Sequence, residues 1–495
     1  MADVIVAGGG PVGLLLASEL KLAGADPLVL ESATDGAARR ARSLGLRGVN
    51  GRSTQSLAMR DLLGPLAEAQ EAVFAAMGEI PGGREAPEVL LRLVREGRAR
   101  GHFGGLALLK APGEGGEATP NYLMKQHALE QILADRAREL GVRIEHGWTV
   151  ADVVTEGDTV TVVADDGRTE RAAYLVGCDG GRSVVRRKAG IEFPGTDATM
   201  TGRTVVAELA DPDSLTSSLR APGGLVNLSM VRGEIATIEF DGGPADRDAP
   251  FTAEELSGSL RRVTGRDIAV KRVEAGIRYS DNTRQAATYR KGRVLLAGDA
   301  AHVHSPIGGQ GLNLGMQDAM NLGWKLGLVV RGIAPESLLD TYHAERHPVG
   351  ERVLRNTRAQ VALMRPGPQI EALREVMSET LAIPVVRDRF IAMANGMDID
   401  YAPDAHPLVG RFLPGPVPQV RDGKALLLSD DDEIRAAATG YEDRVRVTGA
   451  HPDVAGLLVR PDGYVAWATP EPGTDGLAEA LSTWFGAPAA VPVAG

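Results

Sequence analysis

The first 31 residues carry two kinds of hydrophobic pattern, and together they predict a parallel α/β unit. Residues 4–7 form a short unbroken apolar run, which is typical of a strand buried on both faces. From about Pro11 to Leu22 apolar residues recur at helical spacing, and Gly24 follows where a helix would end. A second apolar strand ends at Glu31. The order strand, glycine turn, helix, strand is that of a Rossmann-like unit.

Alternating and helical patterns divide the rest of the chain. Residues 159–180 predict a strand, a turn and a return strand, and strand-like segments recur between residues 203 and 278. Long helical patterns occupy about residues 312–331 and 338–364. After the Pro- and Gly-rich stretch 406–420, short strands and a helix predict a small separate α/β unit.

Composition narrows the possible functions without identifying one. The 495 residues are 43% hydrophobic and 24% charged, as in a globular protein of several domains. The net charge of −11 argues against a nucleic-acid surface, which would need a basic face. No apolar run approaches the ~20 residues that span a bilayer, and the first residues lack a signal-peptide pattern. With Cys178 as the only cysteine no intramolecular disulfide can form, and we expect a cytoplasmic protein that binds neither nucleic acid nor membrane.

Gly8, Gly10 and Gly13 form the pattern G-x-G-x-x-G between the first strand and the first helix. Glycines let the backbone approach a pyrophosphate, and the helix N-terminus, with Pro11 in its first turn, supplies free N–H groups and a partial positive charge. Glu31 follows at about the spacing where an acid binds an adenosine ribose. The motif therefore predicts a dinucleotide site, but it does not distinguish FAD from NAD.

Two further motifs each follow a predicted strand. "CDGGRSVVRRKAG" begins at Cys178, and "GDAAHVHSPIGGQGLNLG" begins at Gly298. Together with the first glycine motif, and in this order, they resemble the class A FAD-dependent aromatic monooxygenases. The stretches 292–326 and 338–354 are most similar to the actinobacterial hydroxylases that modify polycyclic aromatic polyketides. The resemblance covers nearly the whole chain.

The resemblance implies a para-hydroxybenzoate hydroxylase-like α/β fold with a C-terminal thioredoxin-like domain. The expected parts are a Rossmann-like FAD-binding domain (1–74, 101–180 and 276–400), an inserted mixed β-sheet substrate domain (75–100 and 181–275) and the thioredoxin-like domain (401–495). The last part has no cysteine, which excludes disulfide exchange there. Because the flavin motifs all precede it, we expect its removal to leave them intact.

The resemblance also assigns residues to a noncovalent FAD. Asp299 would accept a hydrogen bond from a ribityl hydroxyl. The helix beginning near Leu312 would point its N-terminus at the pyrimidine edge, where the partial positive charge stabilises a reduced flavin. Glycines are needed where a Cβ would collide with the flat ring. The candidate contacts along the ring are Pro306, Gly309, Gly311, Leu312 and Asn313.

Three more candidate contacts come from the resemblance, two of them with structural alternatives. Asp179 and Arg182 would serve both FAD and the nicotinamide cofactor, and a capped helix is the alternative for Asp179. Gln126 matches a glutamine that contacts FAD, and an exposed residue at a helix start is the alternative.

Arginines after the second strand make the register uncertain. The family has arginines along the ribityl and ring path, and "ARSLGLRGVNGRST" offers Arg42, Arg47 and Arg52 in what resembles a small insertion. We choose Arg42 and Arg52 as the expected contacts.

Two histidine pairs are candidates for a metal, but neither has the partners that a metal needs. His302 and His304 lack an accompanying cluster of acids or cysteines, and His343 and His347 lack the order H-E-x-x-H. We therefore expect no metal, and packing or hydrogen-bonding roles for these rings.

The resemblance implies a monooxygenase that uses FAD, NADPH or NADH, and O2 to hydroxylate a polycyclic aromatic polyketide. A flavin C4a-hydroperoxide would transfer oxygen to an electron-rich ring, and the sequence identifies no catalytic acid or base. The alternative is Baeyer–Villiger oxygenation of a polyketide quinone or ketone by the same flavin peroxide. A halogenase is disfavoured because no W-x-W-x-I-P string surrounds any tryptophan. A non-enzymatic flavin-binding scaffold would show no substrate-stimulated NAD(P)H oxidation. We expect a monomer or a homodimer.

Overall fold

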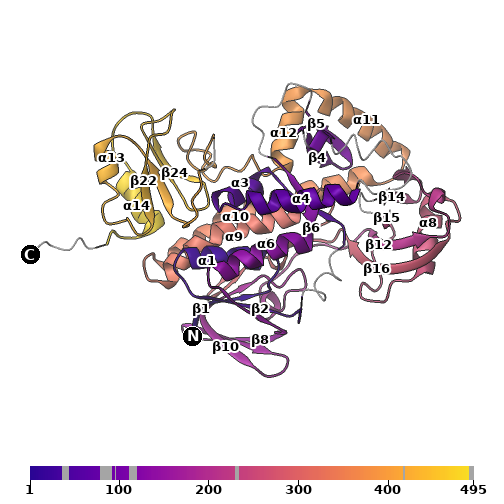
Figure 1. Ribbon diagram of the computed structural model, residues 1–495, viewed down its shortest axis with the longest axis horizontal. Helices are drawn as coiled ribbons and strands as arrows, with labels where there is room; N and C mark the ends of the chain where they lie inside the picture. Colours follow the sequence, from indigo (N-terminus) through magenta and orange to yellow (C-terminus); the bar gives the residue numbers. More distant parts are fainter. Residues whose placement is uncertain are drawn as a thin grey trace, which may run out of the picture.

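The computed structural model describes residues 1–35, 44–77, 92–94, 96–110, 120–228, 233–415 and 418–489. Arg42, an expected FAD contact, lies outside these residues. Figure 1 shows a sheet with long helices above it, a second sheet on the right and a small α/β unit on the left. The predicted α/β fold class is confirmed.

The first sheet is built around β1 (Ala2–Ala7), which is almost wholly buried, as its apolar run predicted. β1 pairs in parallel with β2 (Pro27–Glu31) and with β10 (Thr169–Gly177). The remaining strands of this sheet are β7 (Arg143–His146) beside β2, β19 (Val294–Leu296) and then β18 (Arg290–Lys291) beyond β10, and β8 (Val150–Glu156) and β9 (Thr159–Ala164) as an antiparallel extension.

Helices and short hairpins cover this sheet. Among the described residues, no helix combines the length and the apolar character needed to cross a membrane. The helices are α1 (Pro11–Leu22), α3 (Gly51–Met59), α4 (Leu63–Met77), α6 (Gln126–Glu139), α7 (Val184–Lys188), α9 (Gln310–Val330) and α10 (Asp340–Met364). The short strands are the pair β3 (Leu46–Val49) and β6 (Tyr122–Lys125), and the set β11 (Gly195–Thr196), β17 (Thr283–Gln285) and β20 (His302–Val303).

Helices α1 and α9 lie against each other in the same direction, and glycines on α9 make their close approach possible. A Cβ on Gly323 would lie 2.4 Å from the Cβ of Glu19, and one on Gly327 would lie 2.4 Å from the Cβ of Ala23. Because these pairs advance together along both helices, α1 and α9 begin at the same end of the sheet. That end is the carboxyl end of β1, where open α/β sheets bind ligands.

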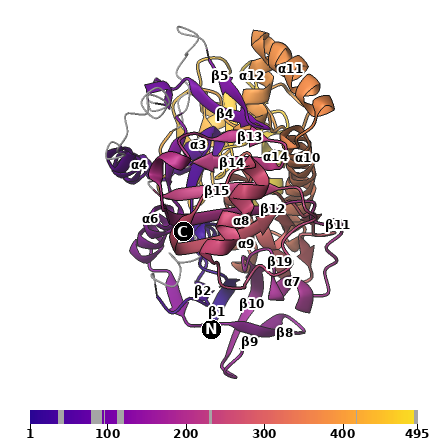
Figure 2. The ribbon, with the colours of Figure 1, turned by 90° about the vertical axis from the view of Figure 1, so that its right-hand side faces the viewer.

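The second sheet is antiparallel, and α8 (Ala253–Thr264) packs against it. Figure 2 shows this sheet and α8 facing the viewer. Its strands follow the order β13 (Leu219–Ala221), β14 (Gly224–Leu228), β15 (Glu234–Glu239), β12 (Thr201–Leu209) and β16 (Val270–Ser280). Nearby lie the hairpin β4 (Ala99–Phe103) and β5 (Leu106–Leu109) and the helices α11 (Pro368–Ala382) and α12 (Pro384–Ala394).

In its described residues, the C-terminal unit has one mixed sheet with two helices. β21 (Ala425–Leu428) pairs in parallel with β22 (Val445–Thr448) and antiparallel with β23 (Gly456–Val459). β24 (Val465–Thr469) completes the sheet, and α13 (Asp432–Ala436) and α14 (Leu477–Phe485) complete the unit. Its sequence-based boundary at residue 401 stays a prediction.

Candidate active site

The glycine turn before α1 leaves an open space in front of the helix N-terminus. A Cβ on Gly8 would lie 2.3 Å from the carbonyl oxygen of Cys178, and one on Gly13 would lie 2.0 Å from the carbonyl oxygen of Gly8. A Cβ on Gly10 would meet no atom within 4 Å. Pro11 is the first residue of α1. Two glycines thus pack the turn tightly, and the third faces the space that a pyrophosphate needs.

Glu31 lies at the end of β2 beside this turn, where the sequence predicted an acid. The backbone N–H of Gly9 donates to its Oε2 at 2.7 Å, and the backbone N–H of Ala33 donates to its Oε1 at 2.7 Å. These bonds fix the orientation of the carboxylate. Each oxygen retains acceptor capacity for the hydroxyls of a ribose.

Asp299 lies beyond the end of β19, in the short helical turn Gly298–Ala300. Its side chain is exposed, yet burial by the surrounding protein raises its pKa, while His302 and Arg47 oppose that rise. No hydrogen-bond donor from the described part of the chain is recorded for its oxygens. An accessible acceptor in a largely desolvated position fits the sequence-based assignment of Asp299 to a ribityl hydroxyl.

A buried charge network supports the turn that carries Asp299. His302 Nε2 lies 2.7 Å from Asp318 Oδ2, Arg346 Nε donates to Asp318 Oδ1 at 2.8 Å, and the N–H of Gly298 donates to Asp318 Oδ2 at 3.1 Å. Although burial opposes ionisation, His302 and Arg346 hold the pKa of Asp318 below its usual value. The network explains His302 as a structural residue.

The loop before α9 is also a glycine turn. Gly309 has φ +64 at the start of α9, and a Cβ on it would meet no atom within 4 Å. Pro306 is exposed, and Gly311 and Leu312 are half-buried in the first turn. α9 begins at Gln310, close to the predicted start. The exposed turn leaves room for a flat ring in front of free backbone N–H groups.

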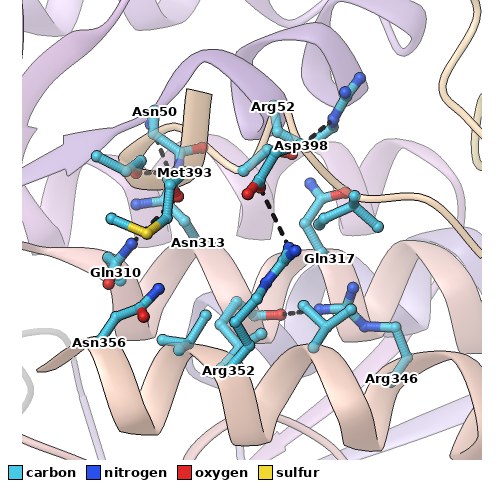
Figure 3. Close-up of a pocket in the computed structure, with 16 residues that line it drawn as sticks. Asn50, Arg52, Gln310, Asn313, Gln317, Arg346, Arg352, Asn356, Met393 and Asp398 are labelled. Carbon is cyan, nitrogen blue, oxygen red and sulfur yellow. Dashed lines mark hydrogen bonds and ion pairs between the residues drawn. The ribbon is translucent and has the colours of Figure 1, made fainter. Parts of the chain in front are cut away.

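Asn313 braces this loop. Its Nδ2 donates to the carbonyl oxygens of Gly48 and Gly309 at 2.8 and 2.9 Å, and its Oδ1 accepts from the N–H of Asn50 at 2.9 Å. Figure 3 shows Asn50 and Asn313 together at the edge of a pocket of about 420 Å³, its opening included. The side chain of Asn313 therefore joins α9 to the end of β3.

Arg47 and Arg52, the two of the three candidate arginines after β2 that the structure describes, have different surroundings. Arg47 Nε donates to Gln126 Oε1 at 3.0 Å, while Gln126 Nε2 donates to Glu130 at 2.9 Å. Burial lowers the pKa of Arg47, and the charge of Asp299 opposes that fall. Arg47 thus lies with Gln126 and near Asp299, which makes it a further candidate for the FAD path beside Arg42 and Arg52. The pairing of β3 with β6 brings Arg47 to Gln126, and no local pattern in the sequence indicates that pairing.

Arg52, the arginine that we preferred, faces the C-terminal unit instead. Its guanidinium lies 4.0 Å from the centre of the Phe412 ring, and its Nε donates to the carbonyl oxygen of Gly396 at 3.2 Å. The residue is only 4% exposed. Figure 3 shows it on the opposite side of the pocket from Gln310 and Asn356.

Asp179 lies beside the first glycine turn, since a Cβ on Gly8 would lie 3.1 Å from its backbone nitrogen, and Arg182 follows three residues later. Asp179 accepts hydrogen bonds from the N–H groups of Val184 and Val185 at 2.7 and 3.1 Å, so it caps α7. Arg182 is exposed and pairs with Asp248 of the middle region at 2.7 Å. The capped-helix alternative describes Asp179, and both residues lie at the seam between the two sheets.

The middle sheet contributes an apolar wall beside the loop before α9. Met200, next to β12, and Ile238 of β15 pack with Ile307 of that loop and with Val361 of α10. Partly buried members of this cluster are Leu225, Phe240, Tyr279 and Met364. The wall thus packs apolar and aromatic side chains around Ile307.

Two titratable groups near this wall are neutral at pH 7. Burial raises the pKa of Tyr279 to about 12 and lowers the pKa of His304 to about 4. His343 and His347 pack against Tyr289 instead, with ring centres 5.8 and 5.3 Å away. In the described part of the chain, no three His, Cys, Asp or Glu side chains gather in a way that could hold a metal.

Comparison with known families covers most of the chain. The FAD binding domain family matches residues 1–357, and the aromatic-ring hydroxylase C-terminal family matches residues 406–488.

Named relatives match over nearly their full length. A 12-dehydrotetracycline 5-monooxygenase/anhydrotetracycline 6-monooxygenase from Streptomyces rimosus is 39% identical, over 98% of this chain and 99% of the relative. A rifampicin monooxygenase from Streptomyces venezuelae is 38% identical with the same coverage. Among solved structures, OxyS anhydrotetracycline hydroxylase from Streptomyces rimosus has a TM-score of 0.83 and 37% identity, over 99% of this chain and 100% of that one.

Both the family matches and the open glycine turns point to the same cofactor. The turns fit FAD at the carboxyl end of the first sheet, as the motifs predicted. The chain therefore belongs to the FAD-binding aromatic-ring hydroxylases and is a flavin-dependent monooxygenase.

Proposed function

We propose that this enzyme adds one hydroxyl group to a polycyclic aromatic polyketide. FAD is its noncovalent cofactor, NADPH or NADH its reductant and O2 its oxygen source. The observation that carries the proposal is the apolar wall between the middle sheet and Ile307, because an aromatic substrate needs such a face beside the flavin ring. Relatives named for anhydrotetracycline and rifampicin support a polycyclic substrate.

The two glycine turns bind different parts of the cofactor. The turn before α1 binds the pyrophosphate at Gly10, and Glu31 binds the adenosine ribose. Asp299 accepts a hydrogen bond from a ribityl hydroxyl, with Arg47 and Gln126 on the same path. The first turn of α9 directs its N–H groups and partial positive charge at the pyrimidine edge of the ring.

The chain's part in the reaction is placement and exclusion of water. When bound and reduced, FAD supplies the oxygen-activating chemistry, which is the cofactor's own. The wall around Ile307 holds the substrate ring and keeps water from the reacting face. Tyr279 and His304 are neutral at pH 7, so the Tyr279 hydroxyl can donate to a phenol or ketone oxygen and His304 Nε2 can accept from a phenol, without fixing a charge beside the substrate. The reductant approaches at the seam between the sheets, beside Asp179 and Arg182, and the ion pair of Arg182 with Asp248 of the middle region supports this assignment.

Isotopic labelling tests the proposal. The purified protein with its FAD is incubated with NAD(P)H, labelled O2 and a panel of polycyclic phenols and quinones, and the products are analysed by mass spectrometry. We expect one labelled oxygen, an unchanged carbon skeleton and faster NAD(P)H oxidation when substrate is present. A labelled lactone would replace hydroxylation by the Baeyer–Villiger alternative, and oxygen arriving only from water would overturn both. The enzyme is proposed to work in the cytoplasm, where NAD(P)H is supplied.

A further inference from the structure

Helix α3 connects the loop before α9 to the C-terminal unit. At its N-terminus the N–H of Asn50 donates to Asn313, and Asn313 in turn holds the carbonyl oxygen of Gly309. Two residues further on, Arg52 reaches the C-terminal unit at Phe412. A movement of α3 would therefore shift the brace that holds the flavin-facing loop.

Arg52 is an unusual side chain to bury. It forms no ion pair with any carboxylate in the described part of the chain, and burial lowers its pKa. Its hydrogen bonds go to the carbonyl oxygen of Gly396 at 3.2 Å and to Gln55 Oε1 at 2.6 Å. The ring of Phe412 lies 4.0 Å from the guanidinium and the ring of Tyr464 lies 5.8 Å away, and both stabilise its charge, as does the more distant carboxylate of Asp398.

Phe412 is itself held rigidly. Its ring meets Tyr464 edge to face, with centres 5.6 Å apart, and it is 6% exposed. A Cβ on Gly463 would lie 2.3 Å from the Phe412 ring, so the turn before β24 closes over it. The position of the ring is thus set by the C-terminal unit.

Buried ion pairs fix the C-terminal unit against the flavin-binding region. Arg460 pairs with Glu345 of α10 at 2.5 Å, and Lys325 of α9 contacts the same carboxylate at 2.8 Å. Arg60, at the end of α3, pairs with Glu19 and donates to the carbonyl oxygen of Val420 at 3.1 Å. These contacts hold the C-terminal unit in place, and none of them involves the N-terminal end of α3.

We propose that Phe412 of the C-terminal unit is a positioning residue for the flavin. It holds Arg52, Arg52 holds the start of α3, and α3 holds Asn313 and the Gly309 turn against the ring. The C-terminal unit, which has no redox cysteine, is thus a working part of the flavin site. The inference rests on the proposed contact between the Gly309 turn and FAD.

The test compares two phenylalanines of the C-terminal unit. Phe412→Leu removes the aromatic face under Arg52 and keeps an apolar side chain. Phe485→Leu is the matched control, because Phe485 is also buried at the interface with α9, against Trp324, but does not touch α3. For both variants we would measure the FAD dissociation constant, the visible absorption spectrum of bound flavin, the melting temperature and the peroxide formed per NAD(P)H.

We expect Phe412→Leu to weaken FAD binding about tenfold, the worth of a desolvated cation–π contact, and to shift the flavin spectrum. Phe485→Leu should lower the melting temperature and leave FAD affinity within about twofold. Arg52→Gln should resemble Phe412→Leu, and the double variant should be no worse than either one, because both remove the same link. The inference is overturned if the two leucine variants bind FAD equally well, or if the double variant's loss is the sum of the single losses. Wild-type protein that binds no FAD would instead overturn the proposed function.

Discussion

The glycine turn before α1 is held by backbone, whereas the loop before α9 is held by side chains from distant helices. At the first turn, Gly8 and Gly13 press against the carbonyl oxygens of Cys178 and Gly8. At the second, Gly308 faces the amide of Gln360, with which a Cβ would clash at 2.7 Å. Asn50 supports the second loop through Asn313, and the Asp318 network supports the first turns of α9 behind it, because Arg346 also donates to the carbonyl oxygen of Leu314 at 3.1 Å.

The first turn is therefore determined by local sequence, and the second loop by tertiary contacts. A turn held by backbone needs only glycines at fixed spacing and two adjacent parallel strands. A loop held by side chains depends on residues that the rest of the fold delivers. Substitutions at the first turn should therefore change mainly the space for the ligand. Substitutions around the second loop should also change the stability of the protein and the position of the flavin.

The largest expected effect is at the first turn, in the variant Gly10→Val. The added side chain meets no protein atom, so the fold should persist, but it occupies the space in front of α1 and should abolish FAD binding. The measurement is flavin content of the purified protein, with circular dichroism to check folding. Gly64→Val is the control, since Gly64 is equally open in the first turn of α4 and should keep its flavin. Full flavin content in Gly10→Val would show that this turn binds nothing.

The second turn should be most sensitive through its buried support, in the variant Asp318→Asn. The change leaves Arg346 without its buried counter-charge and should lower the free energy of unfolding by about 3–5 kcal/mol. Denaturant unfolding measures the loss. Asp340→Asn, which breaks the exposed pair with Arg290, should cost less than about 1 kcal/mol. Equal costs for the two variants would show that the Asp318 network does not support this loop.

The same contrast explains what the sequence could predict. The spacing of Gly8, Gly10 and Gly13 and the position of Glu31 are local, so the strand and the turn were predictable, while the FAD contacts assigned to these residues and to Asp299 stay predictions. The hydrogen bond of Arg47 to Gln126 could not be predicted, because it depends on β3 pairing with β6. The contact of Arg52 with the Phe412 ring could not be predicted either, because the two lie far apart along the chain, and which arginines contact FAD stays a prediction. Side-chain contacts between segments far apart in the sequence cannot be predicted from the local pattern of hydrophobic residues.

His304 should make the second loop sensitive to acid in a way that the first turn is not. Burial lowers its pKa to about 4, below the usual value of about 6.5. As pH falls below about 6.5, the His304 imidazole is protonated in the unfolded state but stays neutral in the folded state. Stability is therefore lost between about pH 6.5 and pH 4, by up to about 3 kcal/mol.

The variant His304→Gln should flatten this part of the pH profile. Urea unfolding at pH 7, 5.5 and 4.5 would measure the difference between wild type and variant, and His406→Gln, outside the loop, is the control. An unchanged slope in His304→Gln would mean that the ring is protonated as readily in the folded protein as in the unfolded chain.

The smallest expected effect lies between the two turns, at Asp299. Its carboxylate is accessible and accepts no recorded hydrogen bond from the described residues, so Asp299→Ala should hardly disturb the protein itself. What it removes is an acceptor for a ribityl hydroxyl, and the loss of one charged hydrogen bond should weaken FAD binding by about 1–3 kcal/mol, or about 5- to 150-fold. Titration of apoprotein with FAD measures the change, and Asp299→Asn, which keeps one carbonyl oxygen in place, should retain part of the affinity. If Asp299→Ala binds FAD as tightly as wild type, the ribityl chain follows another path, and Arg47 with Gln126 becomes the better candidate for it.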